Sequence, residues 1–172
     1  MIKFIKKLFS ISICIKSKNG DKTWYSLNGK LHRLNGPAVE RKFIKSWYQY
    51  GKRHKIDSPA IECADGYKEW YLNDQLHRED GPAQVHPNVS EVWWLNGERH
   101  RENGPAVIES NGYKAWWLNG KLQREDLPAS IFADVTKEWN LYGKTYHADN
   151  SKQNISKIIL EPIITKRLIE FD

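Results

Sequence analysis

The sequence predicts an all-β fold, an antiparallel β-hairpin repeat array in which about six copies of a 23-residue motif form one elongated meander sheet. Three observations carry this prediction. One motif recurs through most of the chain, each copy holds two short runs of strand-forming residues, and turn dipeptides separate these runs at fixed offsets.

The repeat can be aligned directly. The third copy runs from Trp70 to Ala83 as Trp-Tyr-Leu-Asn-Asp-Gln-Leu-His-Arg-Glu-Asp-Gly-Pro-Ala, and the fourth keeps the same order from Trp93 to Ala106. The aromatic residue that opens each copy is expected at Tyr25, Trp47, Trp70, Trp93, Trp116 and Trp139. The second, fifth and sixth copies depart from the pattern, and atypical end copies are expected because an end copy has only one neighbour to pack on.

Each copy combines two strand signals with two turn signals. In the copy that follows Pro105, residues 106–109 are rich in strand formers, Asn111-Gly112 is a hairpin dipeptide, and the aromatic run 113–118 predicts a second strand. Asn119-Gly120 then turns the chain again. Gly and Pro at fixed offsets exclude long helices between residues 23 and 150, so we expect about twelve strands there.

Strand alternation predicts which side chains share a face. Trp116 and Leu118 are expected on one face of the sheet and Trp117 on the other. The first aromatic position is filled in all six copies, whereas the second varies. We therefore expect the first position to face the core and the second, which includes Trp94 and Trp117, to be partly exposed.

The two ends differ from the repeats. We expect a basic N-terminal arm or cap over residues 1–22, the six-copy β-hairpin domain over 23–150 and a C-terminal capping segment over 151–172. Residues 10–15 alternate as a strand does, residues 2–9 suit a helix, and the segment after Pro162 suits a short amphipathic helix that covers the last sheet edge. No stretch approaches the roughly 20 apolar residues of a membrane span.

The net charge of +6 is unevenly distributed. Residues 1–22 carry six Lys against one Asp, whereas residues 23–150 carry 17 basic and 17 acidic residues. Nucleic acid is therefore not expected as the main partner, because such a partner needs a basic stripe along the binding surface. The two cysteines, Cys14 and Cys63, form no CxxC pair, which favours a reducing, cytoplasmic location, the host cytoplasm if the source is viral.

A row of His-basic pairs is the most suggestive candidate site. With strands about 4.8 Å apart, pairs in successive copies would lie about 9–10 Å apart and could bind an anion through charge-assisted hydrogen bonds. The alternative is structural, because acidic residues closely follow three of the four pairs and a residue repeated in every copy usually builds the copy. Together with two aromatics, the candidate binding residues are His32, Arg33, His54, Lys55, His77, Arg78, Trp94, His100, Arg101, Trp117 and Arg124.

No catalytic, metal or cofactor site is predicted. The sequence holds no HExxH, GxSxG, P-loop or dinucleotide fingerprint. Histidines 9–10 Å apart cannot share a zinc ion, whose ligands lie about 2.0–2.1 Å away. We expect a protein without enzymatic activity and without a cofactor.

The order aromatic–aromatic–Leu-Asn-Gly, His-Arg, Asp/Asn-Gly-Pro-Ala resembles the MORN-like repeats over residues 23–150. It is most similar to a divergent form found in bacteriophage and giant-virus proteins and in bacterial proteins often labelled as antitoxins. The Gly-x-Gly positions of the standard MORN repeat are absent here. The resemblance implies an elongated β-hairpin array used for protein or ligand contacts, and it supports the fold more than any function.

Three functional hypotheses follow. The first is a non-enzymatic scaffold that contacts another protein, as a phage-type inhibitor of a host defence factor would. The second is a sponge for a nucleotide or another small anionic ligand that uses the His-Arg row. The third is a membrane-surface adaptor that uses the basic, amphipathic residues 1–9.

Overall fold

The structure, a computed structural model, describes residues 11–124, 127–134, 136–141 and 144–148. The helices predicted over residues 2–9 and after Pro162 lie outside this part of the chain. All regular elements of the described residues are strands, and no helix among them is long and apolar enough to cross a membrane. The all-β prediction is therefore confirmed for the described residues.

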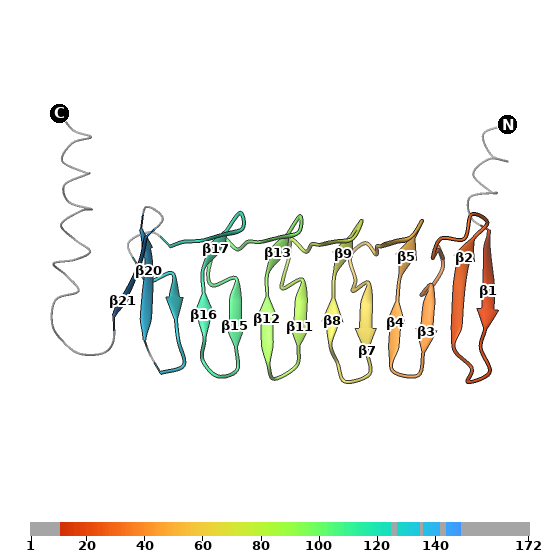
Figure 1. Cartoon of the computed structure of the whole chain (residues 1–172), viewed down its shortest axis with the longest axis horizontal. Coiled ribbons are helices and arrows are strands. Elements are labelled where there is room, and N and C mark those ends of the chain that lie inside the picture. The colour runs from red at the N-terminus through yellow and green to blue at the C-terminus, as the bar shows by residue number, and fades with distance from the viewer. Residues whose placement is uncertain (1–10, 125–126, 135, 142–143, 149–172) are drawn as a thin grey trace, which may run out of the picture.

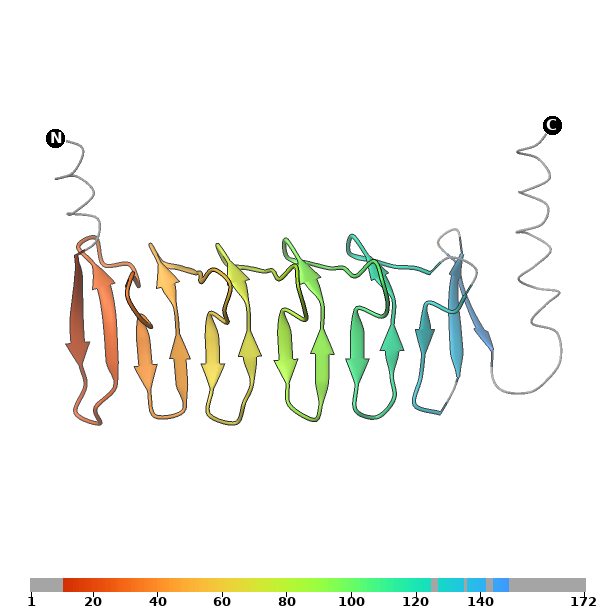
Figure 2. The same cartoon turned by 180° about the vertical axis from the view of Figure 1, so that it is seen from behind.

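The main sheet has thirteen antiparallel strands that follow one another in chain order. Hairpins of similar size stand side by side along the long axis (Figures 1 and 2). The predicted strand at residues 10–15 is confirmed as the edge strand β1. The strands of the main sheet are β1 (Ser12–Lys16), β2 (Lys22–Ser26), β3 (Val39–Arg41), β4 (Ile44–Ser46), β7 (Ile61–Cys63), β8 (Lys68–Glu69), β11 (Gln84–His86), β12 (Ser90–Val92), β15 (Val107–Glu109), β16 (Lys114–Ala115), β19 (Ser130–Ile131), β20 (Lys137–Leu141) and β21 (Lys144–Ala148).

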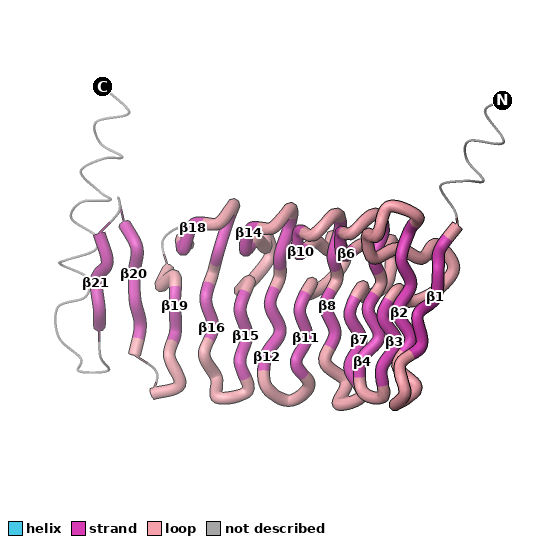
Figure 3. Tube along the Cα trace, turned by 45° about the vertical axis from the view of Figure 1, so that its right-hand side comes forward, coloured by secondary structure: helices cyan, strands magenta, loops and turns pink. Residues whose placement is uncertain are grey.

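Four small two-stranded hairpins branch from one end of the main-sheet hairpins, where Figure 3 shows them side by side. They are β5 (Tyr48–Gln49) with β6 (Lys52–Arg53), β9 (Tyr71–Leu72) with β10 (Gln75–Leu76), β13 (Trp94–Leu95) with β14 (Glu98–Arg99), and β17 (Trp117–Leu118) with β18 (Lys121–Leu122). Two of the four turns use the predicted Asn-Gly, and the other two use Tyr50-Gly51 and Asn73-Asp74. At the turn of Asn96 and Gly97 the φ angles are 53° and 83°. Positive φ at both central residues gives the tight hairpin turn.

The expected two strands per copy are therefore corrected to four. The aromatic run 113–118 does not form one strand, because its hydrogen-bond partner changes at Trp116. The amide of Trp116 donates to the Ala129 carbonyl of the main sheet at 2.8 Å, and its own carbonyl accepts from Gln123 of the small hairpin at 3.0 Å. The same exchange occurs at the leading tryptophan of each of the first five copies, namely at Trp24, Trp47, Trp70, Trp93 and Trp116.

The first copy begins one residue earlier than its sequence suggests. Trp24, and not Tyr25, donates to the Pro-Ala carbonyl, here that of Ala38, at 2.7 Å. The sequence alignment was misled because the turn between Ser26 and Lys30 holds one extra residue, while the loop between Arg41 and Ile44 is one residue shorter than its equivalents. In the structure the leading tryptophans are therefore spaced by 23 residues throughout.

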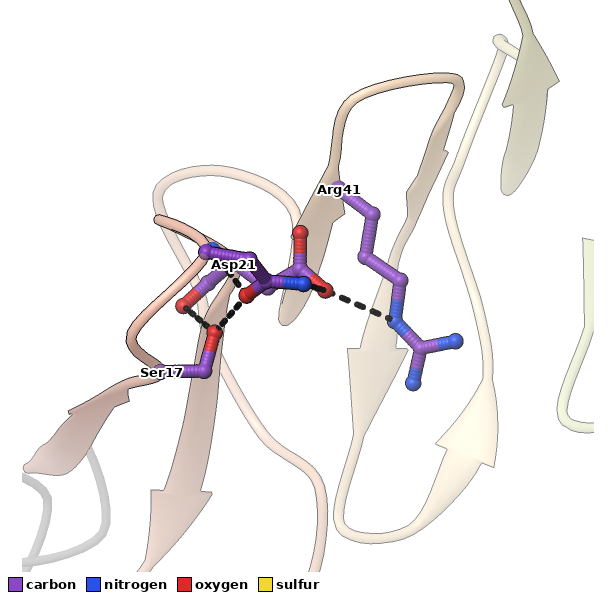
Figure 4. Close-up of polar contacts among 4 residues, drawn as sticks. Ser17, Asp21 and Arg41 are labelled. Carbon is purple, nitrogen blue, oxygen red and sulfur yellow. Dashed lines mark hydrogen bonds and ion pairs between the residues drawn. The ribbon is translucent and has the colours of Figure 1, made fainter.

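The two end copies lack a complete small hairpin in the described residues. At the start, a single bridge between Tyr25 and Leu31 stands in its place. At the other end, β20 continues straight past Trp139 and pairs with β21. The first turn is fastened to the next hairpin, because the Asp21 carboxylate lies 4.0 Å from Arg41 Nε and the Asp21 carbonyl accepts from the Ser17 hydroxyl (Figure 4).

The core lies between the main sheet and the small hairpins. We call the side of the sheet that the small hairpins cover the inner face. Valine and alanine side chains of this face (Val92, Val107 and Ala115) pack against Trp94 and Trp117. The Ala of each Pro-Ala pair is 0–1% exposed, at Ala38, Ala60, Ala83, Ala106 and Ala129.

The expected assignment of the aromatic faces is corrected for Trp47, Trp94 and Trp117, whereas Trp139, which is also in the first position, is buried as expected. Trp94 and Trp117, in the second position, contact the core cluster. Trp47, in the first position, lies on the opposite, outer face, where Lys55 bridges its ring to Glu62. The small hairpin reverses the chain's direction after the leading tryptophan, so simple alternation through one continuous strand no longer applies.

The outer face of the sheet carries a cross-strand row that starts with alternating charge. Lys22, Glu40, Lys45, Glu62 and Lys68 follow one another across the strands. Opposite charges directly across an antiparallel pair stabilise one register over a slipped one. The row thus explains how short strands of two or three residues keep their alignment.

Replacing Ala106 by Leu should destabilise the array by about 1–3 kcal/mol, because the residue is fully buried and the added carbons have no space. The midpoint of urea unfolding, followed by circular dichroism, measures the effect. Ala64→Leu in an exposed loop is the matched control. An equal midpoint for the two variants would contradict the packing described for the Pro-Ala position.

Candidate functional site

The basic residue of each of the four predicted His-basic pairs stacks on the leading tryptophan of its own copy, and so does Arg124, which continues the row after Gln123. We call these five contacts the Trp–cation ladder. The distances from the guanidinium carbon or ammonium nitrogen to the ring centroid are 3.8 Å for Arg33 on Trp24, 3.5 Å for Lys55 on Trp47, 4.3 Å for Arg78 on Trp70, 3.8 Å for Arg101 on Trp93 and 3.9 Å for Arg124 on Trp116. All ten side chains are partly exposed.

The Gly-Pro-Ala segment is shaped to the stacked arginine. Arg101 donates from Nη1 to the Pro105 carbonyl at 3.0 Å, and Arg33 and Arg78 make the same contact in their copies. A Cβ added at Gly81 would stand 2.8 Å from the Arg78 guanidinium carbon. A side chain at Gly81 would therefore displace the guanidinium, and Gly36 and Gly104 also have φ of 139° and 133°, which side chains other than glycine rarely adopt.

Two departures from the motif fit this explanation. In the second copy Ser58 replaces the glycine, and the stacked residue there is Lys55, which has no planar guanidinium. In the fifth copy Leu127 replaces it beside Arg124, which stacks but makes no hydrogen bond to a proline carbonyl among the described residues. Burial lowers the pKa of Arg124.

The histidines of the row join neighbouring copies. His77 Nδ1 lies 2.9 Å from Asn96 Oδ1 and accepts from the Asn96 amide at 3.2 Å, and His100 contacts Asn119 in the same way. His54 Nδ1 lies 3.0 Å from Asn73 Oδ1. Each contact reaches the left-handed turn residue of the next small hairpin, so this geometry favours the structural role for the histidines.

In the first copy, His32 makes a variant of this contact between copies. It is fully buried and accepts from the Tyr50 amide through Nδ1 at 3.2 Å, and its ring stacks on Tyr50 with centroids 4.3 Å apart. Its Nε2 has no hydrogen-bond partner within the described part of the chain. Tyr50 replaces the Asn of other copies, so an aromatic stack substitutes for the Asn contact.

Trp94 and Trp117 both contact Arg99, a residue that was not among the predicted site residues and that lies between the two rings. Arg99 places its guanidinium carbon 5.3 Å from the Trp94 ring centroid and 5.1 Å from that of Trp117. A signal for it existed in the sequence, because the residue before each histidine alternates between Leu and Arg, as Leu31, Arg53, Leu76 and Arg99.

A polar cluster on the inner face was also missed. Glu69 is 9% exposed and accepts from the Tyr67 hydroxyl, while Gln84 Nε2 donates to Tyr67 at 2.7 Å and to Glu69 at 3.0 Å. Burial, followed by the hydrogen bond to Glu69, raises the pKa of Tyr67 to about 12. Burial and the charge of Glu69 also raise the pKa of Tyr71 to about 12.

No group of three or more His, Cys, Asp or Glu side chains in the described residues is arranged to hold a metal ion. The arrangement offers repeated contact surfaces, in which stacked cations, indoles and a few buried polar groups recur or vary along one axis. Such a surface is suited to recognition by hydrogen bonds and aromatic contact.

No family model and no curated protein sequence matches this chain. The resemblance to MORN-like repeats therefore stays a prediction that rests on the repeated motif.

The fit between glycine and guanidinium can be tested at Gly81, whose φ lies outside the left-handed region, so that the cost of a substitution is steric. Gly81→Ala should cost about 0.5–2 kcal/mol, because Arg78 must leave its stack and its hydrogen bond. In an Arg78→Lys background the cost should shrink, as the natural Lys55–Ser58 pair indicates. A double-mutant cycle on the free energy of urea unfolding measures the coupling between residues 78 and 81. An equal cost of Gly81→Ala in both backgrounds would contradict the steric explanation.

Glu69→Gln should allow tyrosine ionisation at lower pH than in the wild type, because Tyr67 and Tyr71 lose the neighbouring carboxylate. A raised phenol pKa stabilises the fold below the unfolded value near 10, and this stability is lost as pH rises through about 12. The near-ultraviolet absorbance of tyrosinate follows the titration. Tyr67→Phe assigns the signal, and a titration unchanged in Glu69→Gln would refute the role given to Glu69.

Proposed function

We propose that this protein is a non-enzymatic binding scaffold that contacts another protein through the Trp–cation ladder. The ladder itself is the observation that carries the proposal. It offers five partly exposed indoles with a cation on each, on the outer face, at intervals of about 9–10 Å given by the spacing of two strands. Trp and Arg are the residues most enriched among the energetic centres of protein interfaces.

The ladder is ordered before a partner arrives. Stacking on the indole and the hydrogen bond to a proline carbonyl fix Arg33, Arg78 and Arg101. Binding therefore costs little of the side-chain entropy, about 0.5–1.5 kcal/mol per side chain, that mobile arginines would lose. This preorganisation supports a surface used for contact.

The contacts of the ladder favour a protein over a nucleotide sponge. Arg33, Arg78 and Arg101 already donate to a proline carbonyl, and Arg78 Nε also donates to Asp80 at 2.8 Å. A phosphate would compete with these acceptors for the same guanidinium groups. The replicated chemistry likewise supports contact without catalysis, since a reaction centre needs one unique constellation.

The MORN-like resemblance extends the proposal to the class of partner. Because the divergent form of the repeat occurs in phage proteins, we propose a host protein, such as a defence factor, which this chain would antagonise by covering part of its surface. The flat, elongated outer face suits a broad or extended surface on the partner.

Affinity capture from a host lysate, followed by mass spectrometry, tests this function. A specific host protein should be retained by the wild type and reduced at least about tenfold with Arg78→Ala plus Arg101→Ala, since two interface arginines are lost. Lys52→Ala plus Lys121→Ala removes the same charge from exposed residues of the small hairpins and should leave retention unchanged. Failure of any protein to exceed background, or equal loss with both variants, would overturn the proposal.

A further inference from the structure

The position before the repeat histidine holds an arginine in two copies, and in the described residues only Arg53 of these two forms an ion pair. Arg53 pairs with the next copy, where its Nε donates to Asp74 Oδ1 at 2.8 Å and its amide donates to the same oxygen at 3.0 Å. Burial alone would raise the pKa of Asp74, but these hydrogen bonds and the charge of Arg53 lower it. The pair lies near the surface, with the two side chains 33% and 42% exposed.

The equivalent acid is missing beside Arg99. The place of Asp74 is taken by Gly120, and the place of Glu69, which accompanies Asp74 in the third copy, is taken by Ala115. The backbone is otherwise the same, because Gly120 donates its amide to the Arg99 carbonyl at 3.0 Å as Asp74 does to that of Arg53 at 2.9 Å. Arg99 is therefore held as Arg53 is held, without the carboxylate.

Three side-chain N–H donors of Arg99 and the two indoles around it have no acceptor. Arg99 Nε, Trp94 Nε1 and Trp117 Nε1 are buried and have no hydrogen-bond partner among the residues that the structure describes. Arg99 forms no ion pair there either, and its guanidinium is held between the two indoles. A buried donor without an acceptor is disfavoured, so an acceptor brought to Arg99 Nε would satisfy a group that is unpaired here.

We propose that Arg99, Trp94 and Trp117 form a binding site for a carboxylate that takes the position held by the Asp74 side chain beside Arg53. The proposal deepens the proposed function and rests on it where the carboxylate belongs to an acidic side chain of the protein partner. The same chemistry would also accept a free carboxylate. Gly120 leaves the approach without a side chain of its own, and the nearest group to its missing Cβ is the carboxyl end of Glu98, at 3.4 Å.

The chain contains the variants that test the site. Arg99→Leu introduces leucine, which occupies the equivalent position in three other copies, at Leu31, Leu76 and Leu122. The fold therefore accommodates leucine at this position. Glu98→Lys plus Gly120→Asp reproduces the Lys52, Arg53 and Asp74 arrangement and supplies the missing carboxylate from the chain itself. Gly120 has φ of +72° and Asp74 has 71°, so the backbone is already suited to the change.

Nitrogen–proton NMR of the full chain, on the indole and guanidinium Nε–H signals, reads the site directly. The probes are acetate and a capped hexaglutamate peptide. Hexaglutamate should shift the signals of Trp94, Trp117 and Arg99 saturably, and its affinity should fall about 10–100-fold in Arg99→Leu, as loss of a charge-assisted hydrogen bond implies. In Glu98→Lys plus Gly120→Asp the Arg99 signal should be shifted before any probe is added, and binding should be lost.

Arg53→Leu is the matched control and should leave the titration unchanged, because the Arg53 site is already filled. Comparable site occupancy by acetate and hexaglutamate would assign a free carboxylate ligand, whereas binding of the peptide alone would assign an acidic side chain. Absence of saturable shifts with both probes, or shifts unaffected by Arg99→Leu, would overturn the site. If Arg99→Leu still captures the host protein at the wild-type level, the Arg99 site is not part of the partner contact, and the proposed function is unaffected. If the wild type captures no protein, the proposed function is rejected, and the NMR result is unaffected.

Discussion

The fold depends on the change of hydrogen-bond partner at the leading tryptophan of each copy. Its amide belongs to the main sheet and its carbonyl to the small hairpin, as at Trp93, which donates to Ala106 at 2.7 Å and accepts from His100 at 3.2 Å. One residue thus fixes where a sheet strand ends and where the branch begins. A hairpin of two-residue strands is too small to be stable alone, so this anchorage and the packed core beneath it provide its stability.

The same junction arranges the side chains of the Trp–cation ladder and of the core. Once the chain branches, the leading indole lies on the outer face, within reach of the basic residue eight positions later. The second aromatic is turned onto the inner face, where it meets the valines and alanines of the core. Backbone topology thereby separates an indole–cation surface from an indole–aliphatic core. Each amide of the basic residues also bonds the next copy, as Arg78 does to Trp94 at 3.1 Å, so copies are joined by backbone as well as by histidine.

Much of this architecture could be predicted from the sequence, because period and turn chemistry are local properties. Asn-Gly indicated the turns at Asn96 and Asn119, and repetition indicated that neighbouring copies pack alike. The branch at Trp116 could not be predicted, since its cause is a hydrogen bond to Ala129, a residue thirteen positions later. The register of the first copy could not be predicted for a related reason. An extra residue in one turn is compensated in the loop after Arg41, which keeps the spacing of the tryptophans and shifts by one all the residues between that turn and that loop.

The candidate site was also only partly predictable from the sequence. The sequence identified the His-basic row, but its pairing of Arg with Trp needed the fold, as did the reason for glycine before proline. The residues it missed, Glu69 and Arg99, are those at which one copy differs from another. Comparison between copies contained that signal, but its meaning depended on which positions meet across a copy boundary.

A periodic surface has a physical weakness as a recognition surface. If every copy offered the same contacts, a partner could slide by one copy, about 9–10 Å, at little cost in free energy. Features that occur once remove this degeneracy. The buried Glu69 cluster lies in the middle of the array, and the inner face becomes apolar from Val92 to Ala115.

The charge pattern of the cross-strand row on the outer face also changes close to the Glu69 cluster. After Lys68 its alternating charges give way to Val85, Glu91, Ile108 and Lys114, in which apolar and charged residues alternate. Both faces therefore distinguish the two halves of the array, and Arg99 lies in the second half. The ladder would supply contact area common to all registers, while the features that break the repeat would select one of them. In this protein, specificity is expected where the copies cease to be alike.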